Sequence, residues 1–145
     1  MVRQAERFDF PLWIAKLDVS KAFDRVDREA LWRTLIEAGV HSDYIFAIRR
    51  MHEAMQASVV VNGVTSKVFD VQRGVRQGDP LSALLFSAVM EWALQSTVSD
   101  WQARSVGIDT GGDRNLTNLR FADDMLLFAT SKTELLQMIS ARRKH

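Results

Sequence analysis

Two adjacent aspartates, Asp123 and Asp124, stand between two apolar runs that are typical of β-strands, Leu116–Phe121 and Met125–Ala129. This pattern predicts a hairpin that carries two carboxylates at its turn. Aspartate is a common turn residue, so a plain hairpin explains the pair. Adjacent like charges also repel unless a cation lies between them, and carboxylate oxygens are ligands that Mg²⁺ prefers. Two interpretations therefore stay open, a simple turn or part of a metal site.

Asp18 is the candidate third carboxylate. It lies near the end of Leu12–Val19, an apolar segment interrupted by Lys16, which predicts a strand. A strand end and a hairpin turn can direct carboxylates from distant parts of the chain at one point. Three such groups can hold two divalent metals about 3.5–4 Å apart. The alternative is that Asp18 only ends a strand or accepts backbone N–H bonds.

The pattern between these carboxylates predicts an α+β protein rather than a regular alternation of strand and helix. Asp27 and Ser42 are expected to cap two successive helices. The valine runs on either side of Asn62-Gly63 predict a β-hairpin, because that dipeptide favours a tight two-residue turn. The expected order is strand, two helices, hairpin, long helix, hairpin and helix.

The long helix is expected from Leu81 to about Ser99, where Asp79-Pro80 provides a capping residue and a proline at the first helical position. Glu91 is its only charged residue before Asp100, which predicts a central, largely buried helix. A polar, glycine-containing segment over residues 102–115 then predicts a flexible connection. Ser131 and Glu134 have the spacing of a capping box that starts a last helix.

The loop that precedes the long helix, Arg73–Gly78, is the other candidate binding element. Glycines allow a backbone to approach a ligand closely, and Arg76 and Gln77 offer donors to a phosphate or a base edge. A polar loop that leads into a buried helix explains the same residues without a ligand. Phe23 suits either a pocket wall or a core anchor. Asp24 is expected to cap, or to pair with Lys21 or Arg25.

Composition narrows the classes of protein. There is no cysteine, which excludes disulfides, thiolate zinc sites and cysteine nucleophiles. No uninterrupted apolar run approaches about 18 residues, so no membrane partner is expected. Residues 1–7 lack the apolar core of a secretory signal, so an intracellular location is expected, either nuclear or cytoplasmic. The net charge of +1 excludes a uniformly basic nucleic-acid surface, but metal ions held by carboxylates would attract phosphate.

Three ordered motifs resemble the reverse transcriptases, in particular those of non-LTR (LINE-like) retrotransposons. Leu17–Val26 resembles the first-aspartate motif of the palm, and Gly74–Ser82 resembles the glutamine-glycine motif that leads into the long palm helix. Phe121–Asp124 resembles the paired-aspartate hairpin. Their order and spacing make the combination specific, and the resemblance covers about Leu12–Ala129. Two departures are Phe121, where tyrosine is usual, and Ala83, where proline is frequent.

The resemblance implies an RNA-directed DNA polymerase, in which a primer 3′-hydroxyl attacks the α-phosphate of a deoxynucleoside triphosphate (dNTP). The implied fold is α+β, a polymerase palm whose small antiparallel sheet packs on helices, with partial fingers. The implied cofactor is two Mg²⁺ ions, for which Mn²⁺ can substitute, and the implied partners are an RNA template and a DNA primer. The implied roles are metal ligation by Asp18, Asp123 and the Val19 carbonyl, completion of the acidic site by Asp124, a steric gate at Phe23, and a nucleotide and template pocket lined by Arg76, Gln77 and Gly78.

The same resemblance implies that residues 1–145 are a partial domain, a palm core with fragments of fingers and without thumb or endonuclease. The remaining fingers and thumb segments of a longer polyprotein are then expected partners, and the isolated chain is expected to be feeble or inactive because little would hold primer and triphosphate in place. The alternatives are a catalytically inactive remnant or palm-fold interaction module, and a palm-like nucleotide cyclase.

Overall fold

The computed structural model describes residues 11–140 of the 145. The N-terminal segment that bears on a secretory signal lies outside them. The described chain forms two compact units, one from the described parts of Met1–Ser20 and Ala93–His145 and the other from Lys21–Trp92. The elements follow the predicted order, and the mixture of helices with small antiparallel sheets confirms an α+β protein.

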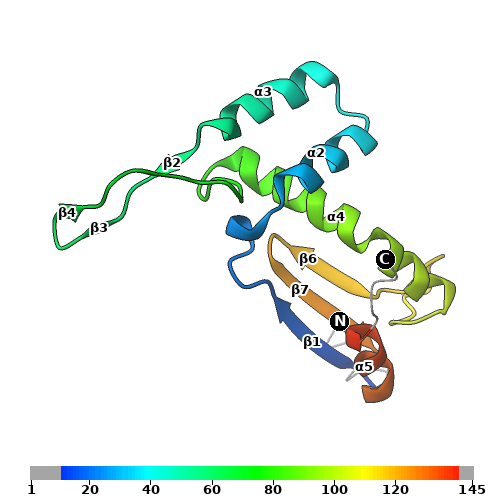
Figure 1. The fold of residues 1–145 in the computed structure, drawn as a ribbon. Coiled ribbons are helices and arrows are strands. Elements are labelled where there is room, and N and C mark those ends of the chain that lie inside the picture. Colours follow the sequence, from blue (N-terminus) through cyan, green and yellow to red (C-terminus); the bar gives the residue numbers. More distant parts are fainter. Residues whose placement is uncertain (1–10, 141–145) are drawn as a thin grey trace. The chain divides into compact units, whose positions relative to one another are not determined.

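The first unit is built on a three-stranded antiparallel sheet in the order β1-β7-β6 (Figure 1). Its strands are β1 (Trp13–Asp18), β6 (Asn118–Phe121) and β7 (Asp124–Ala129), which confirms the predicted first strand and last hairpin. Helix α5 (Lys132–Ser140) follows β7 and packs against β7 and β1. The sheet therefore joins the first described strand to a hairpin about a hundred residues later in the sequence.

The two faces of this sheet differ because side chains alternate along each strand. Met125 and Leu127 lie on one face and are buried. Lys16, Asp18 and Asp124 lie on the other face, where all three are at least partly exposed. The carboxylates thus lie on the face opposite Met125 and Leu127, at its exposed end, whereas Phe128 farther along the same face is buried.

The segment that leads from the long helix to β6 has a structure of its own. Ile108 forms an antiparallel bridge with Leu116, and the side-chain amide of Gln102 donates to the Asn115 carbonyl at 2.8 Å. Val106 and Ile108 are buried. The two ends of the segment are thus held by the fold, whereas residues 109–114 between them are exposed, and the flexibility expected there stays a prediction.

The second unit begins with the short helix η1 (Phe23–Arg25), followed by α2 (Arg28–Glu37) and α3 (Ser42–Glu53), which pack together. Asp27 caps α2 as predicted, since its Oδ1 accepts from the Ala30 amide at 3.0 Å. The predicted cap of α3 is wrong by one residue. His41, rather than Ser42, precedes the helix, and its ring Nδ1 accepts from the Asp43 amide at 3.3 Å.

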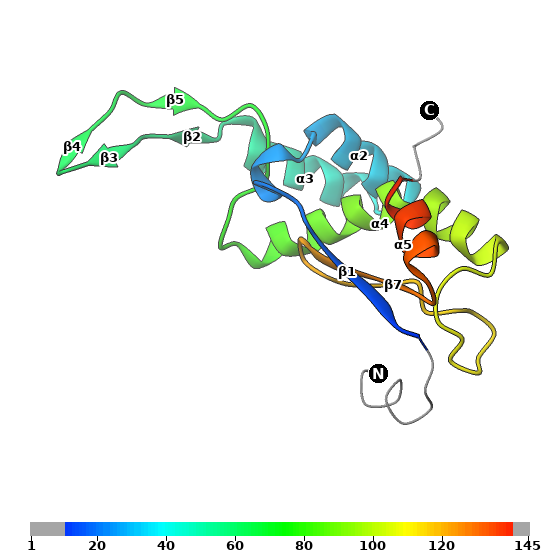
Figure 2. The ribbon, with the colours of Figure 1, turned by 90° about the horizontal axis from the view of Figure 1, so that it is seen from below.

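The predicted Asn-Gly hairpin is confirmed as a long arm that extends away from α2 and α3 (Figure 2). Asn62 and Gly63 have φ values of 51° and 80°, as a tight hairpin turn of the I′ kind requires. Residues 58–70 are exposed. The arm pairs β2 (Gln56–Ala57) with β5 (Phe69–Asp70) at its base and β3 (Val60–Val61) with β4 (Val64–Thr65) at its tip.

Helix α4 (Pro80–Ala103) begins where predicted and extends past Ser99. The expectation that it is largely buried is wrong: its buried residues are Ser82, Leu85, Phe86 and Trp101. The helix is apolar all round, so neighbours on one side leave apolar residues on the other exposed. Among residues 11–140 it is the one helix that is long and apolar enough to span a membrane, with a mean hydropathy of 1.3. Core helices of soluble proteins meet the same criteria of length and composition.

Candidate active site

The candidate residues form two groups, one in each compact unit. In the first unit, Asp18 ends β1 and lies directly opposite Asp124, the first residue of β7. Asp123 is the second residue of the two-residue turn between β6 and β7, directly before Asp124. Ala122 opens this turn with a φ of 51°, a left-handed conformation that is costly for a residue with a Cβ. We call Asp18, Asp123 and Asp124 the aspartate end of the sheet.

A lysine lies at the aspartate end. The Nζ of Lys16 is 2.8 Å from Oδ1 of Asp124, although both side chains are about half exposed. The hydrogen bond and charge of Asp124 raise the pKa of Lys16. Desolvation lowers this pKa by less than Asp124 raises it, and the charges of Asp18 and Asp123 make the smallest contributions, both of which raise it. In the sequence, Lys16 is noticeable only as an interruption in an apolar strand. Side chains two residues apart on a strand lie on the same face, so the spacing of Lys16 and Asp18 could have placed this lysine beside the carboxylates.

The donor chemistry of the aspartate end suits a hard divalent cation, because carboxylate oxygens are the ligands that Mg²⁺ takes. The arrangement of these side chains, however, does not suit such a cation. Within residues 11–140, no three acidic or histidine side chains are grouped so that they could hold a metal ion. The ammonium of Lys16, rather than a three-carboxylate cage, balances the charge there.

In the second unit, the Arg73–Gly78 loop is bound to the segment around η1. The Gly74 amide donates to the Val26 carbonyl at 2.9 Å, and the Val75 amide donates to the Phe23 carbonyl at 2.9 Å. A Cβ on Gly74 would lie 2.8 Å from Cα of Asp24, which is closer than real Cβ contacts come. Glycine at position 74 thus permits close approach to the chain's own backbone.

Gln77 and Asp24 form a direct contact between these two segments. The Gln77 side-chain amide donates to Oδ1 of Asp24 at 2.9 Å. The partner of Asp24 is therefore Gln77 rather than the expected Lys21 or Arg25. The predicted structural role of Asp24 is retained. Asp24, Arg76 and Gln77 line a pocket of about 790 Å³ together with Arg73 and the base of the hairpin arm.

Phe23 and Gly78 do not line that pocket. The ring of Phe23 stacks on that of Phe86, with centroids 4.9 Å apart and planes 18° from parallel. Phe86 is itself buried, so the stacking anchors Phe23 on the core. Gly78 has a φ of 84°, which explains the glycine by backbone conformation.

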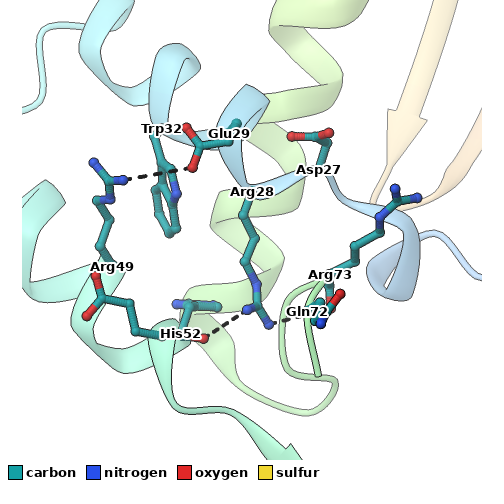
Figure 3. Close-up of a pocket in the computed structure, with 9 residues that line it drawn as sticks. Asp27, Arg28, Glu29, Trp32, Arg49, His52, Gln72 and Arg73 are labelled. Carbon is teal, nitrogen blue, oxygen red and sulfur yellow. Dashed lines mark hydrogen bonds and ion pairs between the residues drawn. The ribbon is translucent and has the colours of Figure 1, made fainter. Parts of the chain in front are cut away.

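A second pocket, of about 300 Å³, shows a residue that sequence reasoning missed (Figure 3). The Arg28 guanidinium donates to the Gly74 carbonyl at 3.0 Å and to the His52 carbonyl at 2.9 Å. Burial lowers the pKa of Arg28. His52 is buried, with its Nδ1 2.8 Å from the Ile48 carbonyl oxygen, as befits a structural histidine. Arg28 thus ties the loop to α2 and α3, and no sequence signal pointed to it.

The motifs and the geometry can now be set beside known proteins. The family model described as "Reverse transcriptase (RNA-dependent DNA polymerase)" matches residues 4–145, nearly the whole chain. The chain belongs to the reverse transcriptase family. Its relatives place this reverse transcriptase domain with the non-LTR retrotransposon type, as the motifs predicted.

Three relatives illustrate the similarity. The chain is 34% identical over 136 residues to the "Retrovirus-related Pol polyprotein from type-2 retrotransposable element R2DM" of Drosophila melanogaster, covering 93% of the chain and 12% of the relative. It is 36% identical over 118 residues to a Pol polyprotein from a type-1 retrotransposable element R2 of Popillia japonica, covering 79% and 16%. It is 30% identical over 132 residues to the "Transposon TX1 uncharacterized 149 kDa protein" of Xenopus laevis, covering 90% and 10%. The chain therefore spans about a sixth or less of the length of these relatives.

Proposed function

We propose that this reverse transcriptase domain supplies the catalytic palm of an RNA-directed DNA polymerase, which extends a DNA primer on an RNA template with dNTPs. The observation that carries the proposal is the pairing of Asp18 with Asp124 at one end of the β1–β7 ladder, with Asp123 in the adjacent turn. Carboxylates from segments about a hundred residues apart share one sheet end, and carboxylates are the ligands that nucleotidyl transfer assisted by metal ions uses. The three-stranded antiparallel sheet with α5 packed on it is compatible with a palm.

In this proposal Asp18, Asp123 and the Val19 carbonyl would hold Mg²⁺, and Asp124 would complete the acidic site. Members of the family generally use divalent metal ions, which stabilise charge on the transferring phosphoryl group. These ligands require that the ammonium of Lys16 leave the aspartate end, because it now contacts Asp124.

The residues of the second unit would bind and orient the nucleotide and template. The guanidinium of Arg76 lines the larger pocket and suits a phosphate or a base edge. Gln77 is held by Asp24, and the loop backbone is held by η1, so the loop carries both side chains with little freedom. Such preorganisation matters because phosphoryl transfer depends mainly on alignment and charge stabilisation. Gly78 would shape the loop, and Phe23, anchored on Phe86, would act as the steric gate below the sugar.

Primer extension tests the proposal. The chain is incubated with an RNA template, a DNA primer, dNTPs and Mg²⁺, and compared with Asp124→Asn and with Asp113→Asn, an exposed aspartate in the loop before β6. Extension by the wild-type chain should fall by about a hundredfold or more in Asp124→Asn, as expected when a group that stabilises transition-state charge is lost. Asp113→Asn should retain it. Extension that survives Asp124→Asn would show that the aspartate end is not the site.

A second candidate is a non-catalytic member of the family that retains the fold as an interaction module. The observation that favours it is the contact of the Lys16 ammonium with Asp124 at the aspartate end. No extension by the wild-type chain, together with retained binding of a primer–template duplex, would support this candidate over the first.

A further inference from the structure

We propose that Lys16 is the internal counter-ion of the aspartate end, and that a divalent metal ion binds there only by displacing its ammonium group. This inference rests on the proposed function, because it concerns the same carboxylates.

The strand register brings Lys16 to this place. Asp18 is the Cα partner of Asp124, and Lys16 lies two residues before Asp18 on the same face of β1. Lys16 is therefore a diagonal neighbour of Asp124, a separation that long side chains span. The Lys16 side chain spans this separation, because its Nζ lies 2.8 Å from Oδ1 of Asp124.

The charges on this face of the sheet require a cation. Like charges directly opposite each other on paired strands are destabilising, and Asp18 and Asp124 are such a pair. By the alternation of side chains, Lys16 is the only basic residue on this face of the three described strands. The other residues there are apolar or acidic, namely Ile14, Asp18, Leu119, Phe121, Asp124, Leu126 and Phe128.

Lys16 can leave without repacking the core. Its side chain is 61% exposed, and lysine carries its charge on a flexible four-carbon stem. Its Nζ lies 2.8 Å from Oδ1 of Asp124, the residue that is paired with Asp18 and adjacent to Asp123. A divalent cation that takes these oxygens would repel the ammonium at close range. The lysine and the metal therefore compete.

Binding of Mn²⁺ to the full 145-residue chain, followed by the electron paramagnetic resonance of the free ion, tests the competition. Lys16→Met should bind Mn²⁺ about two- to fivefold more tightly than wild type, which is the effect that removal of one exposed ion pair corresponds to. Lys16→Arg, which keeps the charge, should resemble wild type. Lys132→Met, which removes an exposed lysine at the start of α5 in the same unit, should also bind like wild type.

Thermal unfolding provides a second measurement. Without metal, Lys16→Met leaves the carboxylates uncompensated and should melt below wild type. Added Mn²⁺ should raise its Tm by more than it raises that of wild type, because a tighter ligand stabilises the folded state more. Lys16 is exposed, so circular dichroism should show an unchanged fold.

Three results would overturn the inference: equal Mn²⁺ affinity in Lys16→Met and wild type, equal tightening in Lys132→Met, or no Mn²⁺ binding in either wild type or Lys16→Met. Asp18→Asn separates this failure from that of the proposed function. If Asp18→Asn weakens Mn²⁺ binding while Lys16→Met leaves it unchanged, only the counter-ion role is wrong. If Asp18→Asn leaves Mn²⁺ binding unchanged, the metal ligands of the proposed function are wrong as well.

Discussion

Gly74 shows how one missing side chain fixes the position of a candidate binding loop. Its amide donates to Val26, its carbonyl accepts from Arg28, and a Cβ at this position would overlap the backbone of Asp24. It also has a φ of 84°. The sequence suggested that this glycine allows a ligand to approach, whereas the structure shows that it allows the segment after β1 to approach.

We expect Gly74→Ala to destabilise the chain by about 2–4 kcal/mol, because a positive φ and a backbone overlap act together. Gly78→Ala is the matched control. Gly78 has the same φ of 84°, but a Cβ there meets nothing within 4 Å. It should therefore cost only about 1–2 kcal/mol, the price of the left-handed conformation. Urea denaturation measures both variants, and equal losses would contradict the role of the close approach.

Among the elements, α5 depends on a single carboxylate at its start. The Ser131 hydroxyl accepts from the Glu134 amide at 3.1 Å, which confirms one half of the predicted capping box. The Glu134 carboxylate in turn interacts with the backbone amide of Ser131, which helps to lower the pKa of this carboxylate. It accepts from the amide and hydroxyl of Thr130, both at 2.7 Å, and from the Gly107 amide at 2.9 Å. Glu134 therefore joins α5 to the segment before β6.

The pKa of Glu134 gives this cap a pH dependence. Burial raises the pKa, but the hydrogen bonds from Thr130 and Gly107 outweigh burial and lower the pKa below the ordinary value of 4.5. The ionised carboxylate therefore stabilises the folded chain above the ordinary pKa. This stability is lost as the pH falls through the folded pKa.

We expect wild type to be more stable than Glu134→Gln at pH 7, and we expect the difference to shrink as the pH falls from about 5 to about 3. Urea denaturation at a series of pH values measures this difference. Thr130→Val, which removes only the hydroxyl donor, should reproduce part of the effect. A difference that stays constant over the whole pH range would show that the charge of Glu134 does not stabilise the cap.

At the scale of the whole molecule, the two compact units are joined at two places. One is the peptide bond between Ser20 and Lys21, and the other lies between Trp92 and Ala93 within α4. The aspartate end belongs to one unit, and the Arg73–Gly78 loop belongs to the other. Helix α4 is therefore the longest element that both units share.

We expect Ala93→Pro to destabilise α4 by about 3 kcal/mol, because proline removes a helical hydrogen bond and clashes with the preceding turn. Hydrogen exchange should accelerate in α4 on both sides of residue 93 and stay slow in β7 and α2. Ala93→Ser keeps the amide and should exchange much as wild type does. Loss of protection throughout β7 and α2 in Ala93→Pro would contradict the division into two units.

Local signals in the sequence predicted most of the elements. Asp27, Asn62-Gly63 and Asp79-Pro80 act on their immediate neighbours, so caps and turns were recognised at these positions. The same reasoning failed for α4, because the exposure of an apolar helix depends on what the rest of the chain brings to it. It also misplaced the cap of α3, where a histidine ring takes a role more often filled by serine.

The sequence alone determined the family, the order of the elements and the carboxylates that end β1 and begin β7, because motifs, turns and caps are local. Only the tertiary structure decided what these residues touch. Antiparallel register sets Asp18 against Asp124 and brings Lys16 to them, and close backbone approach pairs Gln77 with Asp24. Such contacts join residues far apart in the sequence, and the balance of charge between them exists only after the chain has folded.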